Sequence, residues 1–212
     1  MVRQKTIPII LACLTLMLTA CLELKQPHNE ISYYTLEYDP PDVTARRTLP
    51  CVIRVKPFSV SPIYNSNRII YRDKSFKRQA YTYYKWRANP GELVAYFLRR
   101  DLQNCGLFKA VVPRDSNLPP AYLLEGTVQE FLEEDRENAW EAILSISITL
   151  IDEKESDVSQ KVLFQKSYQS SRSCRERNPR ALAEALSLAM SQISGKIIQD
   201  AYEVLANVSV VK

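Results

Sequence analysis

Few residues in this sequence could perform catalysis, and those few lie far apart. His28 is the only histidine, so a Ser/His/Asp or Cys/His triad, a zinc site with several imidazoles and a histidine pH switch would all depend on one side chain. The four glycines are about fifteen or more residues from one another, which excludes the glycine-rich motifs that cradle nucleotide phosphates. We therefore predict no catalytic site, no metal site and no enzyme activity.

A group of acidic residues is the nearest approach to a metal site or to the carboxylate pair of a glycosidase. Most of the group falls in a predicted turn between two strands, and its spacing matches no calcium-binding loop. A solvated turn explains such a run of charge. The six residues are Glu125, Glu130, Glu133, Glu134, Asp135 and Glu137.

Cys21 is the residue with the clearest covalent chemistry. It follows Leu18-Thr19-Ala20, which has the form of a bacterial lipobox, where cleavage precedes the cysteine and its sulfur receives a diacylglycerol. With an N-acyl chain, Cys21 would carry a permanent membrane anchor, and no other cofactor is expected. Residues 6–20, behind Arg3 and Lys5, are uncharged, too short to span a membrane and typical of a signal peptide. The alternative is an ordinary cysteine behind an ordinary signal peptide.

The residues after Cys21 indicate where the anchored protein resides. In Gram-negative sorting an Asp directly after the lipidated cysteine favours the inner membrane, whereas this chain has Leu22. We predict the outer membrane, with the domain facing the periplasm on a spacer that can extend roughly 40 Å. The expected organisation is a cleaved signal peptide at 1–20, a lipidated cysteine and tether at 21–32, a single domain at 33–207 and a short tail at 208–212.

Three further cysteines would remain as thiols in the mature chain. Disulfides persist in an oxidising compartment, and three thiols allow one bridge and one unpaired thiol. We favour Cys105 with Cys174, because each is predicted at the end of a helix, although pairings with Cys51 stay open. The alternative is that all three are small buried apolar side chains.

A basic and aromatic segment at 68–87 is the strongest candidate for a binding surface. Seven Lys and Arg residues accompany one acid, Asp73, and are interleaved with six aromatic residues. Such mixtures bind anions and flat surfaces, and an envelope location favours protein partners or phospholipid over nucleic acid. The alternative is that Tyr84 and Trp86 are core residues and the charges only keep an edge soluble. The predicted partner-binding residues are Arg68, Tyr71, Arg72, Tyr83, Lys85 and Trp86.

Alternating apolar residues predict most of a sheet. The strictest alternation falls at 142–152, where apolar residues alternate with Ser145, Ser147 and Thr149, so one face of this strand should be buried. It should pair antiparallel with 122–132 through the acidic segment 133–137. Further strands are expected at 33–38, 52–60, 108–112 and 162–170, and a hairpin from 68–72 and 79–86.

Two helices complete the predicted fold. Asn89-Pro90-Gly91-Glu92 combines an N-cap, a proline at the first helical position and an acid in the first turn, and Gly106 suits the C-terminal end. Asn178-Pro179 begins a second, amphipathic helix of about 28 residues that should end near Asn207. Strand runs without regular β-α alternation indicate an α+β fold, with an antiparallel or mixed sheet and both helices on one face.

The order of several landmarks is similar to that of a known family. They are Tyr33-Tyr34-Thr35-Leu36, residues 55–60, Ser66-Asn67-Arg68-Ile69-Ile70-Tyr71-Arg72, residues 83–86, Pro90, Gly106-Leu107-Phe108, Leu124-Glu125-Gly126 and residues 142–152. Together they resemble the ABC-type transport auxiliary lipoprotein family, the group that includes paraquat-inducible protein C. No catalytic residue belongs to that pattern.

The resemblance implies an outer-membrane lipoprotein that works with a mammalian-cell-entry (MCE) type system, which moves lipids across the envelope. The implied partners are a periplasmic MCE-domain protein and an inner-membrane transport complex, with this protein as the docking or exit component. Phospholipid contact and a homo-oligomer are further arrangements that the sequence allows, and nucleic acid is not expected. The alternative function is a periplasmic carrier that holds a lipid or small ligand between the final helix and the apolar face at 144–150.

Overall fold

Two long antiparallel strands, β7 (Tyr122–Arg136) and β8 (Ala139–Asp152), form the middle of the sheet. On β8 every second side chain from Leu144 to Leu150 is fully buried, as the alternation predicts. β9 (Val162–Ser173) pairs antiparallel with β8 and follows a short helix, α3 (Val158–Lys161). This computed structural model describes residues 30–45, 47–73, 75–136 and 139–211, without the side chains of 209–211.

The other edge of β7 is occupied by three short strands, one after another, and each runs parallel to it. They are β2 (Leu49–Val55), β3 (Ser59–Val60) and β4 (Arg68–Arg72), which pair with β7 from its start towards its end. The single turn of 3-10 helix η1 (Pro62–Tyr64) separates β3 from β4. β6 (Phe108–Val112) pairs parallel with β2, β5 (Arg78–Trp86) antiparallel with β4, and β1 (Ser32–Tyr34) parallel with β5.

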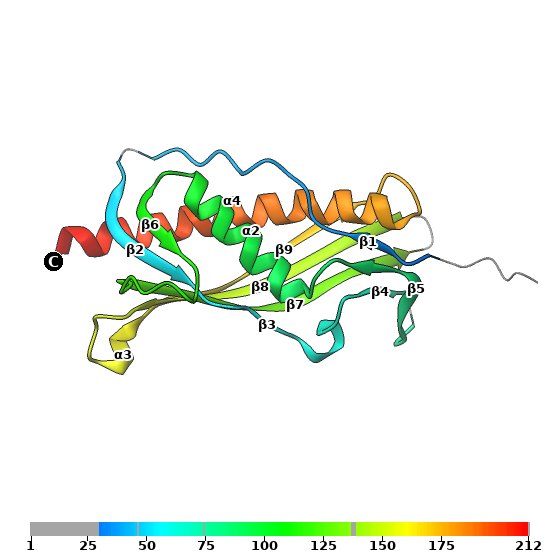
Figure 1. Cartoon of the computed structure of the whole chain (residues 1–212), viewed down its shortest axis with the longest axis horizontal. Coiled ribbons are helices and arrows are strands. Elements are labelled where there is room, and N and C mark those ends of the chain that lie inside the picture. The colour runs from blue at the N-terminus through cyan, green and yellow to red at the C-terminus, as the bar shows by residue number, and fades with distance from the viewer. Residues whose placement is uncertain (1–29, 46, 74, 137–138, 212) are drawn as a thin grey trace, which may run out of the picture. The chain divides into compact units, whose positions relative to one another are not determined.

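Two long helices, α2 (Pro90–Asn104) and α4 (Pro179–Val211), lie along the same face of this sheet (Figure 1). The side-chain oxygen of Asn89 accepts a hydrogen bond from the N–H of Gly91 at 2.9 Å, which caps α2. Asn178 caps α4 in the same way, through the N–H of Ala181 at 2.8 Å. Both predicted caps are therefore present.

The space between α4 and β8 is filled by apolar side chains. Leu186, Ala189, Ile193 and Ile197 from the helix are fully buried in one cluster with the apolar residues of β8. A fully buried aliphatic side chain stabilises the fold by about 1.5–3 kcal/mol relative to an exposed one. The carrier hypothesis placed its ligand in this space, which packed side chains occupy instead.

The α+β architecture with a mixed sheet and two main helices is confirmed, and several boundaries are corrected. The strand expected at 33–38 is only Ser32–Tyr34, and the strand at 52–60 is divided in two because Pro57 cannot donate to a ladder. The final helix continues to Val211. The largest correction concerns 133–137: β7 continues to Arg136, and Glu133 is 1% exposed rather than part of a solvated turn.

The expected disulfide between Cys105 and Cys174 is not formed, and both residues, with Cys51, carry free thiols. Cys105 follows α2 beside the β2–β6 edge, near the start of β7, and its thiol donates to the carbonyl of Leu102. The N–H of Cys174 bonds instead to the carbonyl of Trp140, near the far end of β7. The two cysteines are thus separated along the sheet, and burial raises the pKa of the Cys51 and Cys174 thiols to about 11.

The predictions for Cys21 and the signal peptide fall outside the described residues. Within the ranges that the structure does describe, no helix is long and apolar enough to cross a membrane. The described elements from β1 onwards belong to one unit, which spans Ile31–Lys212.

Candidate functional site

The basic and aromatic segment forms a hairpin of β4 and β5, which is joined to the sheet through β4 and β7. We call Ser75, Phe76, Lys77 and Arg78 the hairpin tip. The carboxylate of Asp73 accepts hydrogen bonds from the N–H and hydroxyl of Ser75, and these bonds lower its pKa. The only acid of the segment is therefore held within its own turn, while all four tip residues are exposed.

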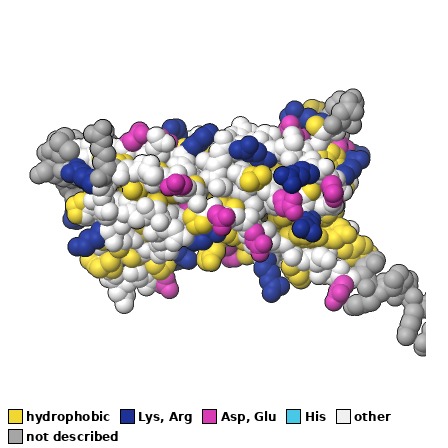
Figure 2. Space-filling view, turned by 90° about the horizontal axis from the view of Figure 1, so that it is seen from above, with side chains coloured by type: hydrophobic (Ala, Val, Ile, Leu, Met, Phe, Trp, Pro, Cys, Tyr) yellow, Lys and Arg dark blue, Asp and Glu magenta, His cyan; other side chains and the backbone are white. Residues whose placement is uncertain are grey.

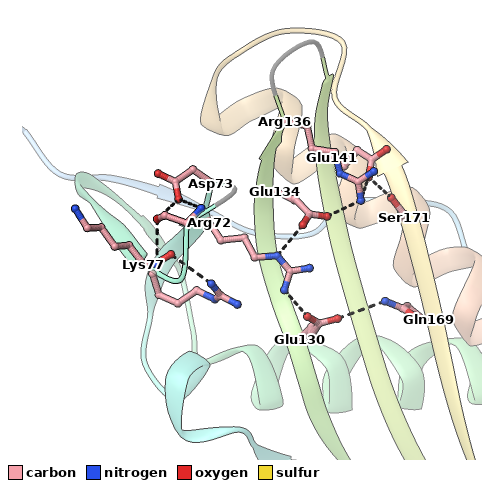
Figure 3. A network of polar contacts seen from close by, with 11 residues as sticks. Arg72, Asp73, Lys77, Glu130, Glu134, Arg136, Glu141, Gln169 and Ser171 are labelled. Atoms are coloured by element: carbon pink, nitrogen blue, oxygen red, sulfur yellow. Dashed lines mark hydrogen bonds and ion pairs between the residues drawn. The ribbon is translucent and has the colours of Figure 1, made fainter.

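Arg72 ties the hairpin to β7 through two ion pairs (Figure 3). Its Nε lies 2.9 Å from Glu134 and its Nη1 lies 2.8 Å from Glu130, so one guanidinium bridges two carboxylates on the same face of β7. Arg136 extends the network to Glu134 at 2.9 Å and to Glu141 on β8 at 3.4 Å. Although partial burial raises the pKa of Glu134, hydrogen bonds from both arginines lower it overall.

On the opposite, helix-facing side of β7, Glu133 makes a second tie to the hairpin. The hydroxyl of Tyr81 on β5 donates to its two carboxylate oxygens, at 3.0 and 3.2 Å. The pKa of Glu133 is raised to about 7, chiefly by burial and to a smaller extent by Asp135, while the Tyr81 hydrogen bond and Arg177 oppose the shift. A buried carboxyl that titrates near neutral pH therefore lies at the base of the hairpin.

A row of aromatic rings continues this helix-facing side. The ring of Tyr81 lies 5.1 Å from Tyr71 and 5.8 Å from Tyr84, and Tyr84 lies 6.1 Å from Tyr34 on β1. The pairs of Tyr84 with Tyr81 and Tyr34 are edge-to-face, and such pairs stabilise by about 0.5–1.5 kcal/mol each beyond the area they bury. β1, β5 and β4 are thus joined by side chains as well as by the ladder.

The six predicted partner-binding residues divide into exposed and internal positions. Arg68 is exposed, Tyr83 is 44% exposed, and Lys85 and Tyr71 are half-buried. Trp86 is 1% exposed and packs its ring against Phe131 at 5.0 Å, so it is a core residue.

Arg72 is also corrected, because its guanidinium is engaged by Glu130 and Glu134 and holds the hairpin rather than offering a free charge. Sequence reasoning missed these partners because it ended the strand at residue 132, which placed Glu134 in a turn. The signal was the two-residue period of a strand: Glu130, Glu134 and Arg136 share one face, and Glu133 shares the other with Phe131. Among the described residues, no cluster of His, Cys, Asp or Glu could hold a metal ion.

Comparison with known protein families identifies residues 34–198 as an ABC-type transport auxiliary lipoprotein component. The chain belongs to this family. The resemblance seen in the sequence is confirmed, and family membership associates the protein with transport machinery of the cell envelope as a membrane-anchored lipoprotein. The family is an auxiliary transport family and not a known enzyme family.

Solved structures show the same fold at low sequence identity. Protein XCC0632 from Xanthomonas campestris matches with a TM-score of 0.75 at 17% identity, over 84% of this chain and 98% of that one. The hypothetical protein CT253 from Chlamydia trachomatis matches with a TM-score of 0.55 at 10% identity, over 74% of this chain and 98% of that one. No curated protein matches the chain.

Replacing Arg72 should loosen the hairpin. In Arg72→Gln, Glu130 and Glu134 lose their shared cation, and we expect the free energy of unfolding to fall by about 1–3 kcal/mol. Amide hydrogen exchange should accelerate first in β4 and β5. Urea unfolding and exchange mass spectrometry measure both effects. The control is Arg68→Gln, at an exposed position on the same strand, whose free energy of unfolding should stay within about 0.5 kcal/mol of the wild-type value. Equal effects of the two variants would show that the Arg72 ion pairs do not hold the hairpin.

Glu133 should make stability fall as pH rises. Its pKa is raised in the folded state, so between its unfolded value and about 7 the folded state holds the extra proton, and stability falls by up to about 1.4 kcal/mol per pH unit. Glu133→Gln should remove this slope. The free energy of unfolding of the variant, relative to that of the wild type, should therefore be higher at pH 8 than at pH 5. Urea unfolding at pH 5 and pH 8 measures the difference, and Glu153→Gln, at an exposed position, is the control. If the unfolding free energies of the wild type and Glu133→Gln change equally with pH, Glu133 is not the cause.

Proposed function

We propose that this protein is the docking component of an MCE-type lipid transport system, held at the outer membrane by lipidated Cys21. The exposed side of the β4–β5 hairpin meets a periplasmic MCE-domain protein, which an inner-membrane transport complex supplies with lipid. Family membership supports the transport role. Leu22 supports the outer membrane, because an Asp at that position would favour the inner one.

The observation that carries the docking role is unbalanced positive charge on Arg68 of β4 and Lys85 of β5, which we call the stem of the hairpin. Arg68 lies directly opposite Lys85, and like charges across a ladder destabilise the pair. The equivalent clash of Arg72 with Arg78 is relieved by the β7 carboxylates, whereas no ion pair in the described part of the chain involves Arg68 or Lys85. An acidic partner surface would relieve this second clash.

The excess of positive charge in the hairpin segment contrasts with the mixed charge on the face that Figure 2 shows. Figure 2 shows Lys and Arg interspersed with Asp and Glu over one face of the molecule, so neither sign dominates there. The hairpin segment carries seven cations and one acid. Complementary charge steers association and fixes which surface meets the partner.

One observation supports the alternative carrier function, although side chains fill the space between α4 and β8 in which the ligand was expected. A surface pocket of about 860 Å³ lies between residues 41–45 and the solvent-facing side of α4, with Pro41, Val43 and Tyr202 among its walls. This volume is within the range of small-ligand sites. Stoichiometric lipid in the purified protein, without an MCE partner, would favour the carrier.

Reversing the stem charges should weaken partner capture. We expect Arg68→Glu/Lys85→Glu to recover about tenfold less MCE-domain protein than the wild type when the tagged protein is isolated from cross-linked membranes and quantified by mass spectrometry. The matched control is Lys109→Glu/Arg114→Glu, which changes the net charge equally at exposed positions on β6 and just after it. Undiminished capture by the stem variant would refute the docking surface.

Replacing the lipidated cysteine should release the protein. Cys21→Ser has no sulfur to accept a diacylglycerol, so we expect the chain to move from the membrane pellet to the soluble fraction, where immunoblotting after carbonate washing detects it. Leu22→Asp is the companion variant, which should keep the anchor but shift the protein to inner-membrane fractions. A Cys21→Ser protein that stays in the pellet would contradict the anchor.

A further inference from the structure

The direction of β1 sets which end of the domain meets the tether. β1 pairs parallel with β5, with Ser32 opposite Tyr84 and Tyr34 opposite Trp86. Because parallel strands run the same way, the chain reaches Ser32 from the side on which β5 begins, and β5 begins at the hairpin tip (Figure 1). An anchor before β1 therefore draws the tip end of the domain towards its membrane.

The tether is long enough to bring the tip to that membrane. Tyr84 follows the tip residue Arg78 by six positions, which is about 20 Å along a strand. A tether from Cys21 to Ser32 can extend roughly 40 Å. The anchor thus permits contact and holds the tip at a high effective concentration near the lipid surface.

The tip has the chemistry of a membrane interface. Phe76 is 107% exposed, the highest value among the exposed large apolar side chains of the described residues. Lys77 and Arg78 follow it directly, both exposed. An apolar ring enters the boundary of headgroups and acyl chains, and adjacent cations contact anionic phosphates.

The tip is also held in shape before any contact. Ser75 accepts a hydrogen bond from the N–H of Lys77 at 3.1 Å, and the hydroxyl of Tyr71 bonds to Gln79 at 2.7 Å across the base of the tip. Arg72 fixes the strand beneath. A preorganised tip loses little conformational entropy when it binds.

We propose that Phe76 inserts into the headgroup region of the membrane that carries the Cys21 anchor, while Lys77 and Arg78 bind lipid phosphates. The inference rests on the anchoring part of the proposed function. It adds a second membrane contact, at the tip, to the acyl anchor, and it orients the domain so that the stem residues Arg68 and Lys85 stand above the lipid surface. The occupant is an anionic phospholipid bilayer.

Tryptophan fluorescence tests the proposal in the full-length protein purified from membranes and reconstituted into vesicles. The probe is Phe76→Trp, and the matched control is Val158→Trp, which replaces another strongly exposed apolar residue, on α3. In phosphatidylglycerol-containing vesicles with brominated acyl chains we expect about twofold more quenching for Phe76→Trp than for the control. Lys77→Gln and Arg78→Gln, each added to Phe76→Trp, should lower the ratio of bound to unbound tip about fivefold.

The outcomes separate this contact from protein docking. Equal quenching of the two tryptophan variants would overturn the membrane contact. Loss of MCE-protein capture in Phe76→Ser, together with an unquenched tip, would also overturn it and assign the tip to a protein partner. If the stem charge reversals leave capture unchanged while Phe76→Trp is quenched, the docking surface fails and the membrane contact stands.

Discussion

The hairpin end of the sheet depends on the guanidinium of Arg72, which bridges Glu130 and Glu134. β4 shares only a short parallel ladder with β7, registered at Tyr71 with Glu133 and Arg72 with Glu134. A ladder this short contributes little without side chains, so the ion pairs and the bond from Tyr81 to Glu133 must complete the junction. Among the described strands the backbone ladder links β1 and β5 to β7 through β4, so the junction helps to set the position of all three strands.

The two ties on β7 have opposite electrostatic characters. On the outer face Glu134 keeps its charge, because hydrogen bonds from arginine lower its pKa overall despite its partial burial. On the helix-facing side Glu133 receives a neutral hydroxyl, and burial raises its pKa to about 7. The outer tie consequently persists through the neutral range, whereas the charge of the inner tie changes within it.

Local patterns predicted the parts of the fold in which one element alone decides the outcome. Asn89 and Asn178 cap their helices, and the alternation from Leu144 to Leu150 buries one face of β8, as expected. The hairpin site was predicted less well, because the roles of Arg72 and Trp86 depend on partners on β7 that are 58 and 45 residues away. A run of acids looks like a solvated turn until the cations opposite it in the sheet are known.

The packing of the core bears directly on the carrier alternative. Side chains of α4 and β8 fill the space where an acyl chain could have been enclosed, and their burial stabilises the domain. Because β1 runs parallel to β5, the chain enters β1 from the end of the domain that carries the hairpin tip, and the membrane orientation that we propose depends on the direction of this one short strand.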